Sequence, residues 1–117
     1  MLKYIASGTI QMFWISGTNP LLSLSNLSRV RELLTNFKLF VVCQDIFMTK
    51  STAIANVVLP AAQWAEKTEC FTNVDRTVHL SHKAVNPFGE AKSDFEIFQS
   101  YFRCMNFRDK DGEPLLP

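Results

Sequence analysis

The sequence predicts an α/β fold with three layers: a short, mostly parallel sheet flanked by helices, accompanied by a small β-hairpin. Two short apolar runs, residues 11–16 and 38–43, stop abruptly in polar residues, which is typical of buried strands. A segment of helical periodicity separates them, and strand, helix and strand within about 30 residues form a unit that pairs its strands in parallel. Residues 71–85 alternate apolar and polar side chains between turn residues, which indicates the hairpin.

The first half of the chain supplies the parallel unit. Residues 1–7 resemble the end of a helix that Gly8 terminates. A helix is expected over about residues 25–36, with Ser25 as its N-cap, because a hydroxyl there can accept a free backbone N–H. Residues 57–59 form a third, very short strand. The apolar positions of the helix are three or four residues apart and form one stripe: Leu27, Val30, Leu33 and Leu34.

The second half holds the hairpin and a last helix. Val78 and Leu80 alternate with polar residues, as in a half-buried strand. The last helix begins at Ser93, which forms a capping box with Glu96. We expect residues 1–106 to form a single domain and residues 107–117 to be an exit linker. One face of the last helix carries four large apolar side chains: Phe95, Phe98, Phe102 and Met105.

Composition narrows the class of protein. A hydrophobic fraction of 47% and ten phenylalanines indicate a packed core. Twelve basic and eleven acidic residues nearly cancel, so nothing favours nucleic acid as a partner. No apolar run has the length of a membrane span, and no signal peptide is evident. Three separated cysteines indicate buried thiols in a reducing, cytoplasmic compartment, with Cys43 and Cys104 as small core residues rather than nucleophiles.

Polar turns after the first two strands hold the candidate binding residues. Gly17, Thr18 and Asn19 follow the first strand, and Gln44 and Asp45 follow the second. Ligands of open parallel sheets bind outside the carboxyl ends of the strands, where an acid can bond ribose hydroxyls. Glycine there permits a positive φ and a close approach of the ligand. Taken alone, the same residues also fit an ordinary strand-to-helix turn and an Asx turn, and the pattern is not a GxGxxG loop.

Other residues with chemical potential favour structural roles. His79 and His82 point to opposite faces of a strand and lack further metal ligands nearby in sequence. Residues 109–112 resemble the start of a calcium loop but lack its glutamate, so a turn is expected. Three loop carboxylates are expected to be solvated or salt-bridged: Glu66, Glu69 and Asp75.

Five segments in the same order resemble motifs of the molybdopterin oxidoreductase family. Residues 15–20 resemble its GTNP turn, and residues 42–49 resemble its QD.F.T segment. Residues 55–67 resemble ADVVLPAA.W.EK. The last two similarities are residues 71–76 with FTN..R and residues 87–94 with P.GEA..D. The sequence is most similar to the nitrate reductase and formate dehydrogenase branch of enzymes that carry bis(molybdopterin guanine dinucleotide).

The resemblance implies a fold, a cofactor and a set of site residues. It implies the third domain of a large subunit, packed around the guanine dinucleotide arm of a bis-molybdopterin guanine dinucleotide cofactor with molybdenum. Asn73 and Arg76 would buttress the site. The cofactor-binding residues that it implies are Gly17, Thr18, Asn19, Gln44, Asp45 and Thr49.

The chain also departs from the family pattern. Asn56 replaces an acid, and Glu69 replaces a glycine. The cysteine cluster for a 4Fe-4S centre and a molybdenum ligand have no counterpart here, so this chain is expected to supply no catalytic or metal residues. We expect a fragment of a larger, nitrate reductase-like enzyme, inactive alone, whose partners are the remaining domains. A formate dehydrogenase-like domain, or a non-enzymatic α/β module that binds a nucleotide or a protein, are the alternatives.

Overall fold

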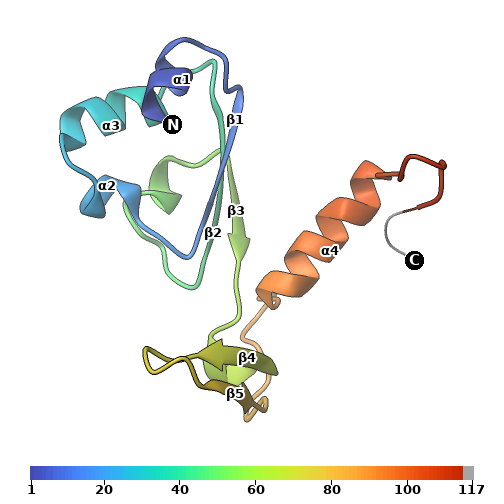
Figure 1. The fold of residues 1–117 in the computed structure, drawn as a ribbon. Helices are drawn as coiled ribbons and strands as arrows, with labels where there is room; N and C mark the ends of the chain where they lie inside the picture. The colour runs from blue at the N-terminus through green and yellow to red at the C-terminus, as the bar shows by residue number, and fades with distance from the viewer. Residues whose placement is uncertain (115–117) are drawn as a thin grey trace. The chain divides into compact units, whose positions relative to one another are not determined.

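A parallel sheet of three strands organises the first part of the computed structural model, which describes residues 1–114 (Figure 1). The strands are β1 (Met12–Ser16), β2 (Phe40–Asp45) and β3 (Val57–Pro60), in the order β1-β2-β3. Ser16 pairs with Gln44, and Gln44 pairs with Leu59, so the carboxyl ends of all three strands share one edge. The predicted α/β class, with a parallel sheet and a hairpin, is confirmed.

Three short helices pack on one face of this sheet. They are α1 (Leu2–Ala6), α2 (Pro20–Ser23) and α3 (Leu27–Leu34). The sheet contributes alternate side chains to the shared core, as the two-residue period of a strand requires. The buried core residues are Ile5, Ile15, Leu21, Val30, Leu33, Leu34, Leu39, Val41 and Cys43.

The N-cap of α3 corrects the sequence prediction. The cap is Asn26, whose Oδ1 accepts the backbone N–H of Arg29 at 3.3 Å, and not Ser25. Asn26 has φ 55°, a left-handed conformation that asparagine adopts more readily than serine. The helix is shorter than predicted, and Leu27 at its start is 42% exposed, whereas Val30, Leu33 and Leu34 are buried.

The chain divides into two compact units, and the second begins at Ala61. It contains the 3-10 turn η2 (Trp64–Glu66), the antiparallel strands β4 (Glu69–Thr72) and β5 (Val78–Ser81), and the helix α4 (Asp94–Met105). The predicted capping box of α4 is confirmed: Ser93 Oγ accepts the N–H of Glu96, and the Glu96 carboxylate accepts the N–H of Ser93.

Burial in the second unit differs from the prediction. Val78 and Leu80 are 63% and 58% exposed, so the prediction that they lie on the buried face of a strand is wrong. The apolar face of α4 is likewise exposed, and Ile97 is its buried residue. The thiol of Cys104 is exposed on the same helix, and that of Cys70 is exposed on β4, so burial is confirmed for Cys43 alone of the three.

The segment after α4 folds back locally. Phe107 lies against Phe102, with ring centroids 5.2 Å apart. The carboxylate of Asp109 accepts the N–H groups of Asp111 and Glu113, which confirms a turn at residues 109–112. Residues 115–117 of the predicted linker lie outside the described residues. Within residues 1–114, no helix is long and apolar enough to cross a membrane.

Candidate functional site

The loop after β1 is fastened to the loop after β2 by one serine. Ser51 is fully buried; its Oγ donates to Asn19 Oδ1 at 2.7 Å and accepts the N–H of Leu21 at 3.2 Å. Gly17, at φ +60°, donates its N–H to the carbonyl of Gln44 at 2.9 Å. Both turns are thereby held at the carboxyl edge of the sheet. Sequence reasoning missed Ser51. The run of hydroxyl residues around it was the one feature of the sequence that could have indicated its role.

Two side chains of the first turn keep hydrogen-bonding capacity. Thr18 is exposed, and its hydroxyl has no hydrogen-bond partner within residues 1–114. Asn19 is half-buried, and Ser51 uses its carbonyl oxygen, which leaves the carboxamide N–H groups without a partner among the described residues. A Cβ on Gly17 would meet no atom, but its left-handed φ makes a side chain there strained. The turn therefore presents donors and backbone around an open space.

Asp45 supplies the acidic group at this edge. It is half-buried at the end of β2, and its Oδ1 accepts the N–H of Phe47 at 3.2 Å, which is the Asx turn that the sequence left open. Its second carboxylate oxygen has no hydrogen-bond partner within residues 1–114. An aspartate in this position can still accept N–H or O–H groups from a ligand.

Gln44 and Thr49 are engaged by the protein itself. Gln44 is buried, and its Oε1 accepts the indole N–H of Trp14 at 3.1 Å on the neighbouring strand. Thr49 is half-buried; its Oγ1 accepts the N–H of Thr52 at 3.2 Å, and its carbonyl accepts the Thr52 hydroxyl. These contacts shape the 3-10 turn η1 (Thr52–Ile54) that follows β2. Both residues support the edge from within.

The buried thiol of Cys43 lies directly behind this edge. Burial, with a smaller effect of the Asp45 charge, raises the pKa of Cys43 to about 11. Its Sγ donates to the carbonyl of Ser51 at 3.4 Å. A thiol with so high a pKa stays protonated and is a poor nucleophile, which agrees with the predicted core role.

Both residues that depart from the family pattern make polar contacts in the structure. Asn56 Oδ1 accepts the N–H of Val41 at 2.7 Å, and the Asn56 N–H donates to the Val41 carbonyl at 2.8 Å. An aspartate could accept the same N–H, so asparagine keeps the contact and loses only the charge. Glu69, which stands in place of a glycine, lies on β4 and pairs with Lys67 at 3.1 Å.

Asn73 and Arg76 lie at the turn between β4 and β5, in the second unit. Arg76 has φ 66° and donates its N–H to the Asn73 carbonyl at 3.0 Å. On β5, the ring of His79 lies 2.9 Å from the Thr77 hydroxyl. Within the described part of the chain, no three histidine, cysteine, aspartate or glutamate side chains gather as a metal site. The structure therefore brings together the residues of the two strand-end loops of the first unit.

Comparisons with known proteins agree on one family. The family model described as molybdopterin oxidoreductase matches residues 1–101. The F420-dependent formate dehydrogenase subunit alpha of Methanocaldococcus jannaschii is 44% identical over 101 residues, which are 86% of this chain. The nitrate reductase of Synechocystis is 40% identical over 111 residues, 94% of this chain. This chain spans about 15% of the length of each relative.

A solved structure shares the fold. Acetylene hydratase from Pelobacter acetylenicus superposes with a TM-score of 0.77 at 25% sequence identity. The match covers 89% of this chain and 15% of that structure. The likeness therefore extends over most of this chain.

Proposed function

The chain belongs to the molybdopterin oxidoreductase family, and on that premise we propose that its first unit holds the guanine nucleotide arm of a bis-molybdopterin guanine dinucleotide cofactor. The observation that carries the proposal is the bond between Asn19 and Ser51, which fixes two polar loops at the shared carboxyl edge of the sheet. Parallel sheets bind nucleotides at this edge. Membership of the family implies a molybdenum–pterin cofactor, and the guanine dinucleotide form is part of the proposal.

The chemistry of the edge fits a guanine nucleotide. The second oxygen of Asp45 would accept N–H groups of the base or hydroxyls of the ribose. The Thr18 hydroxyl and the Asn19 amide would donate to phosphate or carbonyl oxygens. Gly17 adopts its left-handed φ without strain, and the absence of a side chain lets the backbone approach the ligand. Gln44 and Thr49 would act indirectly, by holding Trp14 and the η1 turn in place.

We propose that this unit is part of a larger, nitrate reductase-like molybdenum oxidoreductase. Other domains of that enzyme would bind the 4Fe-4S cluster and supply the metal ligand. The bound cofactor supplies the transfer of an oxygen atom or of hydride equivalents. The residues of this chain only hold and orient it, which is the usual division of labour between protein and cofactor. Three free cysteines support a reducing, cytoplasmic compartment.

Calorimetry with GMP, GDP and AMP tests the anchoring role. The purified chain should bind GMP and GDP in preference to AMP, since the Asp45 carboxylate can accept the N–H groups that guanine offers and adenine lacks. Asp45→Ala should remove the preference, while Asp75→Ala, which removes an exposed carboxylate of the hairpin turn, should leave it intact. Equal affinity for GMP and AMP, or an unchanged preference in Asp45→Ala, would contradict the proposal.

A formate dehydrogenase-like parent is the second candidate, because the relative from Methanocaldococcus jannaschii is 44% identical to this chain. Purified enzyme that carries this chain would be assayed with nitrate and a reduced dye, and with formate and an oxidised dye. Nitrate reduction supports the first candidate and formate oxidation the second. If the purified protein that contains this chain holds no molybdenum, the result would instead support a non-enzymatic module that binds a nucleotide or a protein.

A further inference from the structure

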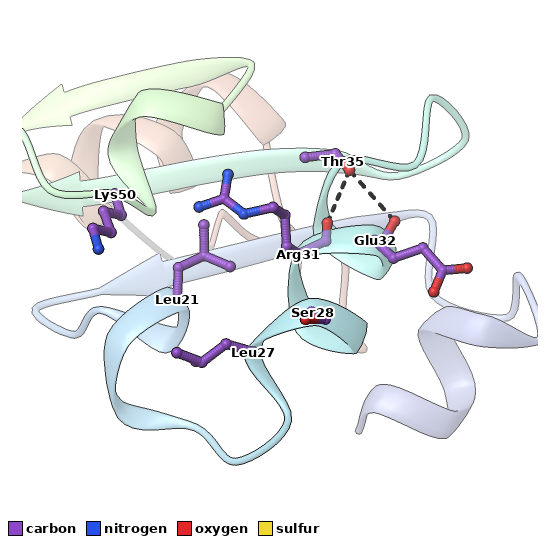
Figure 2. Close-up of a pocket in the computed structure, with 7 residues that line it drawn as sticks. All are labelled: Leu21, Leu27, Ser28, Arg31, Glu32, Thr35 and Lys50. Atoms are coloured by element: carbon purple, nitrogen blue, oxygen red, sulfur yellow. Dashed lines mark hydrogen bonds between the residues drawn. The ribbon is translucent and has the colours of Figure 1, made fainter.

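An open pocket of about 460 Å³ lies along the outer side of α3 (Figure 2). Leu21 of α2 and Leu27 of α3 form its apolar part, and Ser28 lies beside them. Arg31 enters from α3, and Lys50 enters from the loop after β2. The volume is within the range of small-molecule sites, roughly 300 to 1,000 Å³.

The charges in this pocket are unbalanced. Within residues 1–114, neither Arg31 nor Lys50 has an ion-pair partner. Glu32 also lines the pocket, but its carboxylate pairs with Arg29 at 2.8 Å. In Figure 2 the Arg31 side chain extends toward Lys50, whereas the Glu32 carboxylate points the other way. Two cations therefore share one end of the pocket without a compensating anion there.

The polar and apolar parts are arranged for an amphipathic ligand. Leu21 is 3% exposed, so it closes the floor of the pocket but has almost no area left for a ligand, while Leu27 is 42% exposed and offers area that a ligand can cover. The Thr35 hydroxyl is occupied, since it donates to the Arg31 carbonyl at 2.8 Å, so it does not compete for the anion. Arg31 has a guanidinium fork and Lys50 a point charge, and both recognise phosphate well.

We propose that this pocket binds a phosphate monoester with an apolar body. Its dianionic phosphate would lie between Arg31 and Lys50, and its apolar group would cover Leu27. A dianion matches two cations better than a carboxylate does, because a phosphate monoester carries between 1.5 and 2 negative charges, roughly, at neutral pH. The site does not depend on guanine. It shares no residue with the proposed cofactor set, although Leu21 and Lys50 come from the same two loops that follow β1 and β2.

Titration of the isotope-labelled chain, followed by NMR, tests this site with phenyl phosphate, inorganic phosphate and phenol as probes. Phenyl phosphate should bind more tightly than either of the others and shift the amide signals of Ser28 and Arg31. Arg31→Gln and Lys50→Gln should each lower the affinity for phenyl phosphate by up to roughly fivefold, as expected for exposed charge pairs. Added salt should weaken binding further.

Two matched variants control the experiment. Lys38→Gln removes an exposed cation of the first unit that does not line the pocket and has no ion-pair partner within residues 1–114, and it should leave phenyl phosphate binding unchanged. Asp45→Ala should also leave it unchanged, so that failure here and failure of the guanine site are distinguishable. The proposal is overturned if phenol binds as tightly as phenyl phosphate, if Arg31→Gln and Lys50→Gln have no more effect than Lys38→Gln, or if the shifts fall outside the pocket.

Discussion

The two units of this chain are stabilised in different ways. The first, Met1–Pro60, encloses a cluster of nine buried apolar residues between its helices and one face of the sheet. In the described part of the second unit the buried apolar residues are Ala61, Ala62 and Ile97, while Phe88 and Phe95 are 89% and 68% exposed. Core burial stabilises the first unit, and local polar contacts have a larger share in the second.

Polar contacts of the second unit join its parts. Lys67, close to β4, hydrogen-bonds Asp94 at the start of α4 and pairs with Glu69. Burial lowers the pKa of Lys67, but the hydrogen bonds and charges of Asp94 and Glu69 outweigh it, and the net pKa is raised. The Ala62 N–H also donates to the Lys92 carbonyl at 2.8 Å. Such contacts fix which groups lie next to each other, yet each contributes little to the free energy of folding.

The largest expected effect comes from truncating the core of the first unit. Leu34 is 2% exposed, so Leu34→Ala should lower the free energy of unfolding by about 2–5 kcal/mol. Phe95→Ala on α4 removes a larger but exposed side chain and should cost less than about 0.5 kcal/mol. Urea unfolding followed by Trp14 fluorescence in a Trp64→Phe background measures the first unit, and Trp64 fluorescence in a Trp14→Phe background measures the second. Equal costs for the two truncations would refute the contrast between the units.

Cys43 gives the core of the first unit a dependence on pH. Its folded-state pKa is raised from 9.0 to about 11, so the neutral thiol contributes stability that is fully present below pH 9 and is lost as the pH rises toward 11. Because each tenfold change in an ionisation constant is worth about 1.4 kcal/mol, the free energy of unfolding should fall by roughly 2–3 kcal/mol over this range. Urea unfolding between these pH values should show the loss.

Cys43→Ala and Cys104→Ala separate this effect from general alkaline denaturation. Cys43→Ala should remove the part of the pH dependence that belongs to the thiol, whereas Cys104→Ala removes an exposed thiol and should leave it. A thiol reagent should modify Cys70 and Cys104 in the folded chain, and Cys43 only after unfolding. Rapid modification of Cys43 in the folded state would contradict its burial.

Sequence reasoning predicted the first unit better than the second, for a physical reason. Val41 and Cys43 lie in a continuous apolar run between a helix and a turn, and local periodicity is enough to identify such a strand. Val78 and Leu80 alternate with polar residues just as clearly, but alternation does not reveal whether another element packs on the apolar face. The pattern therefore predicted the strand correctly and its burial wrongly.

The site shows the same division between local and long-range information. The turns at Gly17 and Asp45 were evident because glycine and aspartate have strong local preferences. Ser51 was not, since its role depends on meeting Asn19 across 32 positions of sequence. Asn26 rather than Ser25 is the N-cap because the backbone is left-handed at Asn26 and its side chain accepts the Arg29 N–H, and propensity alone does not determine where the helix begins.

Asn56 tests whether the first unit also depends on specific polar contacts. Asn56→Ala removes the acceptor of the Val41 N–H, and an unpaired backbone N–H next to the core should cost about 1–2 kcal/mol. Asn56→Asp restores the residue type of the family motif and keeps an acceptor, so its cost should stay below about 0.5 kcal/mol. Hydrogen exchange at Val41 should be faster in the alanine variant only. Equal exchange in both variants would show that the side chain does not protect this bond.

The smallest expected effect tests the polar contacts of the second unit. Ser93→Ala removes one half of the capping box of α4 and should cost that helix about 1 kcal/mol, whereas Ser93→Thr keeps a capping hydroxyl and should cost less. The hydrogen bonds from Ser93 lower the pKa of Glu96, so the stability from this contact is present above the ordinary glutamate pKa of 4.5 and is lost as the pH falls through the lowered value. At neutral pH, Ser93→Ala should speed hydrogen exchange in the first turn of α4. The difference in exchange rate between this variant and the original chain should therefore become smaller in acid. Ser93→Ala removes no apolar contact, so hydrogen exchange at Val30 in the first unit should not change. A parallel increase at Val30 would mean that the two units unfold together. The difference between their cores argues against that outcome.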